Sequence, residues 1–181
     1  DKLHPWFASQ ESVPLIGNVM ASRWAYEGLA VTQFMENPYE RNFYAFDRRM
    51  KTANWKKDLW VRELENSVSN VRRGLEGHLG QAEMVYDLDL IRNELAKESE
   101  RLNGFAFGAL DKLTPDRVDQ GTMDKVEEAL RVLTHHYRTV YKEAEAEKER
   151  RIAALTAGPD ERQAYFSLLD AYRNESLTEV V

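Results

Sequence analysis

The 181-residue sequence contains no cysteine. This absence excludes disulfides, thiolate zinc sites, iron–sulfur clusters and cysteine nucleophiles, so any metal site would have to use histidine and carboxylate ligands. Glycine and proline are also scarce, with nine and five residues in the whole chain. Because these two residues are the strongest helix breakers, their scarcity favours long uninterrupted helices.

Long apolar runs are lacking as well. No uninterrupted apolar stretch approaches the roughly 20 residues that span a bilayer, and no basic segment followed by an apolar one opens the sequence. The formal net charge is -6, with 25 basic residues dispersed among 31 acidic ones. We therefore expect a soluble fragment without a nucleic-acid partner. Because its first residue is Asp1 rather than Met, we interpret the chain as a piece of a larger protein.

Helix-forming residues dominate what is present. Segments rich in Glu, Lys, Arg, Ala and Leu, with few alternating β-branched stretches, predict an all-α fold without a substantial sheet. Long apolar stripes suit an elongated helical bundle in which amphipathic helices pack antiparallel. Apolar residues at steps of three and four predict five helices, over about 14–35, 38–77, 81–103, 123–155 and 160–174.

The same spacing predicts which side chains face the core. The inner face of the helix over 38–77 combines seven apolar residues: Trp55, Leu59, Trp60, Leu64, Val68, Val71 and Leu75. The inner face of the last helix is expected to combine Phe166, Leu169 and Tyr172. Residues 119–122 precede the helix over 123–155 and are expected to cap it.

Candidate catalytic and metal-binding residues are few. His135 and His136 are adjacent, and neighbouring side chains on a helix point about 100° apart, so we interpret them as partly exposed helix residues rather than ligands. The carboxylate pairs lie in charge-rich helices, and we expect solvated surface there: Glu63 with Glu65, Asp87 with Asp89, and Glu127 with Glu128. No glycine-rich phosphate loop occurs. We predict no catalytic, cofactor-binding or metal-binding residue, and therefore no enzyme.

Aromatic residues are dense in the first third of the chain. The eleven residues in this part are Trp6, Phe7, Trp24, Tyr26, Phe34, Tyr39, Phe43, Tyr44, Phe46, Trp55 and Trp60. A bundle core explains such residues, and so does a surface that meets lipid headgroups or membrane helices, where Trp and Tyr concentrate. The second explanation suits Trp6 and Phe7 better, because they precede the regular helices.

A resemblance to a known family is carried by the first 45 residues. The residues that carry it follow one another in a fixed order: Arg23, Trp24, Tyr26, Glu27, Leu29, Ala30 and Phe34. This order resembles that of the G-subfamily, or White-type, ABC transporters, especially bacterial half-transporters of the Bacteroidetes kind that fuse ATPase and permease. Helix periodicity alone does not explain it. In that family the run lies just outside the membrane, between the fifth and sixth spans.

The resemblance implies a role for each part of the chain. Residues 1–45 would be a membrane-proximal, aromatic-rich segment, and residues 46–181 a helical insertion on the periplasmic side of the inner membrane. Glu27 would lie at the mouth of the transport path with Arg23 as its partner, although an ordinary surface ion pair explains these residues equally well. ATP hydrolysis would belong to other segments of the parent transporter, and this fragment would bind no cofactor.

The implied function is that of a non-catalytic extracytoplasmic domain of an ATP-driven exporter, acting in gating, substrate handover or partner docking. Its partners would be the membrane-spanning part of its own chain, a second copy in a homodimer of the parent, or a periplasmic protein. The alternative is a free-standing helical scaffold or adaptor that binds a protein partner through the grooves of its bundle.

Overall fold

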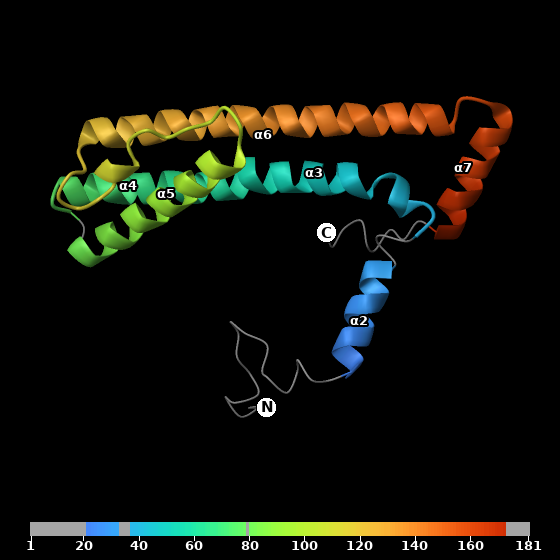
Figure 1. Ribbon diagram of the computed structural model, residues 1–181, viewed down its shortest axis with the longest axis horizontal. Helices are drawn as coiled ribbons and strands as arrows, with labels where there is room; N and C mark the ends of the chain where they lie inside the picture. Colours follow the sequence, from blue (N-terminus) through green and yellow to red (C-terminus); the bar gives the residue numbers. More distant parts are fainter. Residues whose placement is uncertain (1–20, 33–36, 79, 173–181) are drawn as a thin grey trace. The chain divides into compact units, whose positions relative to one another are not determined.

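Every regular element in the described part of the structure is helical. The computed structural model describes residues 21–32, 37–78 and 80–172, and no strand occurs among them, so the predicted all-α class is confirmed. The elements follow in this order (Figure 1): α2 (Ala21–Val31), the 3-10 turn η2 (Glu40–Asn42), α3 (Tyr44–Trp55), the π-helical turn η3 (Lys56–Trp60), α4 (Val61–Leu75), α5 (Gln81–Arg101), the 3-10 turn η4 (Leu110–Lys112), α6 (Gln120–Leu155) and α7 (Pro159–Tyr172).

The chain divides by packing into two compact units. Unit 1 comprises residues 1–47 and 148–181, and unit 2 comprises residues 48–147. The predicted division at residue 45 concerns the roles of two segments rather than their packing, and it stays a prediction.

Unit 2 is a bundle in which α4 and α5 pack against the N-terminal part of α6 (Figure 1). Its helices pack antiparallel, as predicted: Arg49 binds Glu147 near one end of the bundle, and Arg72 binds Asp124 near the other. The fully buried core side chains are mostly aliphatic, and they include Leu64, Val68, Val71, Leu88, Ile91, Leu95, Met123, Val126, Leu130 and Leu133.

Specific residues fix the helix ends. Asp119 Oδ1 accepts hydrogen bonds from the backbone N–H and the hydroxyl of Thr122, both at 2.7 Å, which confirms the predicted cap of α6. At the end of α4, Gly77 adopts a φ of 80°, and the backbone N–H of His78 donates to the carbonyl of Arg73 at 2.8 Å. This arrangement needs a left-handed residue, which glycine supplies without a Cβ clash.

The helix predicted over 38–77 is interrupted by a π turn. Trp55 and Leu59 were expected to face the core, but they are 51% and 54% exposed, so this part of the prediction is wrong. Trp60 and its neighbour Val61 are both buried, at 7% and 3% exposure. The π turn over 56–60 accommodates one residue more than an α turn does and shifts the helical phase, so a stripe extrapolated backwards from Leu64 misplaces the residues before it.

The inner face of α7 also differs from the prediction. Phe166 and Tyr172 are 48% and 46% exposed rather than buried. Tyr165 faces inward instead: its ring centroid lies 6.0 Å from that of Tyr39 and 6.5 Å from that of Phe43. Six of the last eight residues of α7 are apolar or aromatic, so spacing alone does not select the buried face.

Candidate functional site

The core of unit 2 contains a cluster of ionisable side chains, which we call the polar cluster: Lys56, Glu98 and Tyr137. Lys56 Nζ donates to Glu98 Oε1 at 2.7 Å, and the Tyr137 hydroxyl donates to Glu98 Oε2. The three residues are 6%, 2% and 4% exposed. Each comes from a different element, η3, α5 and α6, so the cluster ties these elements together through both oxygens of one carboxylate.

Tryptophan rings surround the lysine end of the cluster. Lys56 Nζ lies 3.7 Å from the centroid of the Trp60 ring and 5.5 Å from that of Trp55. The Trp60 indole N–H donates in turn to Glu94 Oε2 at 2.8 Å, and Lys97 donates to the other oxygen of Glu94 at 2.6 Å. Cation–π attraction and the ion pair together compensate Lys56 for its lost hydration.

Burial and hydrogen bonding shift the pKa of Tyr137 and the pKa of Glu94, the acceptor of Trp60. Burial raises the pKa of Tyr137, and the hydrogen bond to Glu98 raises it further, so its hydroxyl stays protonated and donates. Burial would raise the pKa of Glu94 too, but the hydrogen bonds from Lys97 and Trp60 outweigh it and hold this pKa below its usual value. Both shifts agree with the observed hydrogen bonds, in which the Tyr137 hydroxyl donates and the Glu94 carboxylate accepts.

The chemistry open to the polar cluster is limited by its burial. A general acid or base must come within hydrogen-bonding distance of its substrate, and these three side chains are more than nine-tenths covered. The arrangement suits a structural role, in which removal of one partner leaves a buried charge unpaired.

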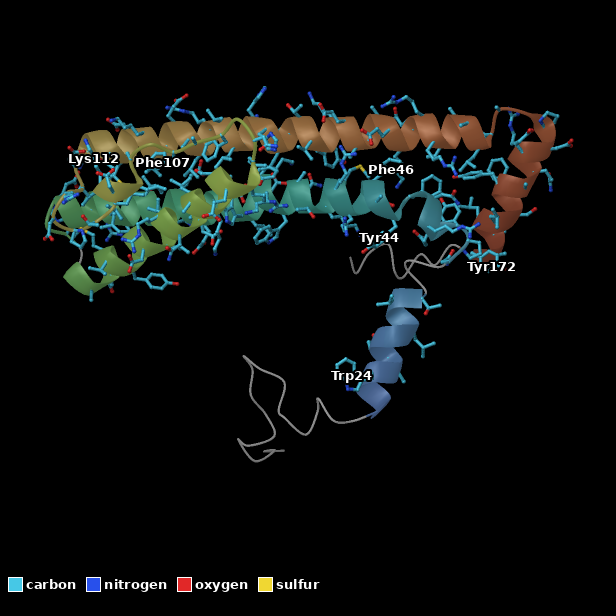
Figure 2. The ribbon with its side chains drawn as sticks, in the orientation of Figure 1. Trp24, Tyr44, Phe46, Phe107, Lys112 and Tyr172 are labelled. Carbon is cyan, nitrogen blue, oxygen red and sulfur yellow. The ribbon has the colours of Figure 1, made fainter. Side chains whose placement is uncertain are left out.

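The residues that carry the family resemblance lie in and after α2. Trp24 is 62% exposed and Tyr26 is 75% exposed, and Figure 2 shows the Trp24 side chain projecting from the helix. The side chains of Arg23 and Glu27 and the whole of Phe34 lie outside the described residues, so the predicted Arg23–Glu27 pair stays a prediction.

Other apolar residues of α2 are exposed as well. Leu29 is 65% exposed and Val31 is 53% exposed. At 100° per residue, Trp24 and Val31 share one side of the helix, whereas Tyr26 and Leu29 share another. Apolar surface is therefore exposed on two sides of one short helix.

The predicted surface histidines and carboxylates lie mostly where expected. His135 is exposed and His136 is half-buried, and no group of three or more potential metal ligands occurs in the described ranges. Asp87 contradicts the prediction of solvated carboxylates, because it is only 7% exposed. It lies in α5, one residue before the core residue Leu88.

Sequence reasoning missed the polar cluster entirely. Its residues are separated by about 40 positions in the chain, and Lys56 and Glu98 each stand among many other charged residues. One signal was available: Glu98 follows Ile91 and Leu95 by seven and three residues, which places it on the buried stripe of α5. A charged residue in that position requires a buried partner.

A cavity of about 530 Å³ lies in unit 2 beside α6. The loop over 104–109 forms one wall, and its two phenylalanines are half-buried and buried; Phe107 is labelled in Figure 2. Ala129 and Val132 line the α6 side, and Val132 is 48% exposed. The cavity is mainly apolar, with charged residues at positions 125 and 128.

Two further findings bear on function. Among the described residues, no helix has the length and apolar character needed to cross a membrane. In comparisons with known proteins, no family model, no curated protein and no solved structure matches the chain.

Proposed function

We propose that this chain is a non-catalytic extracytoplasmic domain of an ATP-driven ABC exporter, in which α2 forms the membrane-proximal contact. In this proposal the helical bundle acts in gating, substrate handover or docking of a periplasmic protein on the outer side of the inner membrane. The membrane-spanning part of the same chain is the principal partner, and a homodimer of the parent would bring two copies of the domain together.

The observation that carries the proposal is the exposure of α2. Trp24, Tyr26, Leu29 and Val31 are each more than half exposed, and they occupy two sides of the helix. A helix with apolar residues on several sides normally packs within a core or against a membrane. Trp and Tyr are enriched where protein meets lipid headgroups, so the composition of α2 favours a membrane boundary over an ordinary protein core.

The polar cluster supports the non-catalytic part of the proposal. Lys56, Glu98 and Tyr137 would be the obvious reactive groups of unit 2, yet all are buried and are hydrogen-bonded to one another. A domain that acts in gating or docking needs a stable core rather than an open reactive site, and the polar cluster is part of such a core.

Reading the gene on both sides of the segment tests the proposal. We expect apolar stretches of about 20 residues, each long enough to span a bilayer, directly before and after the segment. Polar, soluble sequence on both sides would refute a location between two membrane spans.

The alternative function is a helical adaptor, and the cavity beside α6 is the observation that favours it. A mainly apolar cavity of about 530 Å³, with Val132 exposed at its wall, suits the apolar face of a partner helix. A defined cytoplasmic partner that binds the chain but not its Val132→Glu variant would favour the adaptor over the exporter domain.

A further inference from the structure

We propose that the polar cluster and the π turn η3 together form a register lock for unit 2. By register lock we mean a device that selects one alignment of the helices along their axes and excludes alignments shifted by a helical turn. The proposal concerns how the bundle is specified and does not depend on the proposed function.

The aliphatic part of the core does not specify register well. Leu64, Val68 and Val71 of α4 face Leu88, Ile91 and Leu95 of α5, and the two sets have similar shapes and regular spacing. When one helix slides by a turn, each of these side chains meets another aliphatic side chain. Regular aliphatic seams therefore admit more than one alignment unless a polar group penalises the wrong ones.

The polar cluster supplies that penalty. A shift of one turn moves a helix by about 5.4 Å, which would separate Lys56 Nζ from Glu98 Oε1, now 2.7 Å apart. The Lys56 ammonium would then be buried without its acceptor, and Glu98 would keep only the longer contact to Arg101 of its own helix, at 4.0 Å. The Tyr137 hydroxyl would lose its acceptor as well. Ionised groups are far less tolerant of such burial than aliphatic groups are of a changed neighbour.

The Lys56–Glu98 ion pair is one tie between η3 and α5, and the hydrogen bond from Trp60 to Glu94 is a second one. Trp60 follows Lys56 by four residues, and its acceptor Glu94 precedes Glu98 by four. Because α4 and α5 run in opposite directions, the two ties agree on a single alignment. Two further polar residues are buried at matching spacings, since Ser67 follows Trp60 by seven residues and Asp87 precedes Glu94 by seven.

Both ties start from residues of the π turn. It places Lys56, Trp60 and Val61 inside, at 6%, 7% and 3% exposure, while Leu59 remains exposed. The Trp60 ring can then cover the Lys56 ammonium while its indole N–H reaches Glu94. Extra residues of this kind inside long helices recur at positions with a specific task.

The test replaces the polar cluster and the acceptor of the second tie with apolar residues of similar size, as Lys56→Met, Glu98→Leu, Tyr137→Phe and Glu94→Leu in one variant. Because the chain has no cysteine, nitroxide labels can be attached at Ser69→Cys on α4 and Asn93→Cys on α5, two exposed positions. Double electron–electron resonance then measures the distance between the labels, with the polar cluster intact and replaced.

We expect one narrow distance distribution with the cluster intact. The apolar variant should stay helical by circular dichroism and show a broadened or second distribution, displaced by about 5 Å for a shift of one turn. The matched control makes similar replacements in an exposed pair, Glu128→Leu with Arg131→Met, and should keep the narrow distribution. A single narrow distribution in the apolar variant would overturn the proposal. Loss of helical structure in that variant would overturn it too, because the cluster would then be required for folding itself.

Discussion

Lys56→Met gives the sharpest test of the energetics of the polar cluster. The substitution keeps most of the side-chain volume but removes the charge that faces Glu98, a carboxylate only 2% exposed. The Tyr137 hydroxyl still donates to Glu98, and Arg101 Nη1 still lies 4.0 Å from Glu98 Oε1, so the carboxylate loses its close ion pair but not every partner. Removing one partner of a buried ion pair typically costs about 3–5 kcal/mol, and we expect the lower half of that range.

Urea unfolding followed by far-UV circular dichroism measures this loss, because the free energy of unfolding falls linearly with urea concentration. The control is Arg131→Met, which removes one member of an exposed pair with side chains 70% and 64% exposed. An exposed pair contributes about 0–1 kcal/mol, so the control should unfold close to the wild type. If Lys56→Met loses less than about 1 kcal/mol, no more than the control, the polar cluster does not have the energetic role described here.

Three further predictions concern helix ends and α2. Asp119→Ala removes the hydrogen bonds to Thr122 and should lower the thermal midpoint at pH 7. These bonds hold the pKa of Asp119 below its usual value, so the stability that they give is lost as the pH falls. The difference in midpoint between variant and wild type should therefore shrink in thermal melts at pH 3. Gly77→Ala should lower the free energy of unfolding by about 1 kcal/mol in urea titrations, because φ is 80° there; an unchanged midpoint would contradict the left-handed assignment. Leu29→Lys should weaken binding of the chain to phosphatidylethanolamine–phosphatidylglycerol vesicles about tenfold in co-sedimentation, as expected from about 1.5 kcal/mol of lost apolar burial. The control Val132→Lys should leave vesicle binding unchanged. Equal binding of both variants would argue against α2 as the membrane contact.

The sequence predicts the helices of unit 2 well because their apolar residues repeat regularly. Leu64, Val68 and Val71 follow one another at steps of four and three, and all three are buried. The cap by Asp119 was also predictable, since a short acidic side chain before an apolar stripe is a local signal that needs no tertiary information.

The failures arise where local periodicity does not determine the answer. Trp55 and Leu59 were assigned to the core because a π turn leaves no clear mark in the sequence. Phe166 was chosen over Tyr165 because both stand in the mostly apolar second half of α7, and the choice depends on Tyr39 and Phe43, about 120 residues earlier. In both helices, tertiary contacts determine which side chains are buried.

The polar cluster was also beyond prediction from local sequence. In the sequence, each of its residues has a more ordinary interpretation: Lys56 looks like a surface lysine, and Tyr137 looks like a core aromatic residue. Only the fold brings them together across η3, α5 and α6. The membrane-proximal role of α2 rests on the resemblance and on exposure, and it stays a proposal.

The location of the bundle in the parent protein tests the central claim most directly. Ser69→Cys introduces a single exposed thiol into a cysteine-free segment, so a membrane-impermeant maleimide reports which side of the inner membrane holds α4. In spheroplasts that express the full-length parent, with any other cysteines replaced, we predict labelling without permeabilisation and no increase after it. Labelling that occurs only after permeabilisation would place the bundle in the cytoplasm and contradict the exporter-domain account.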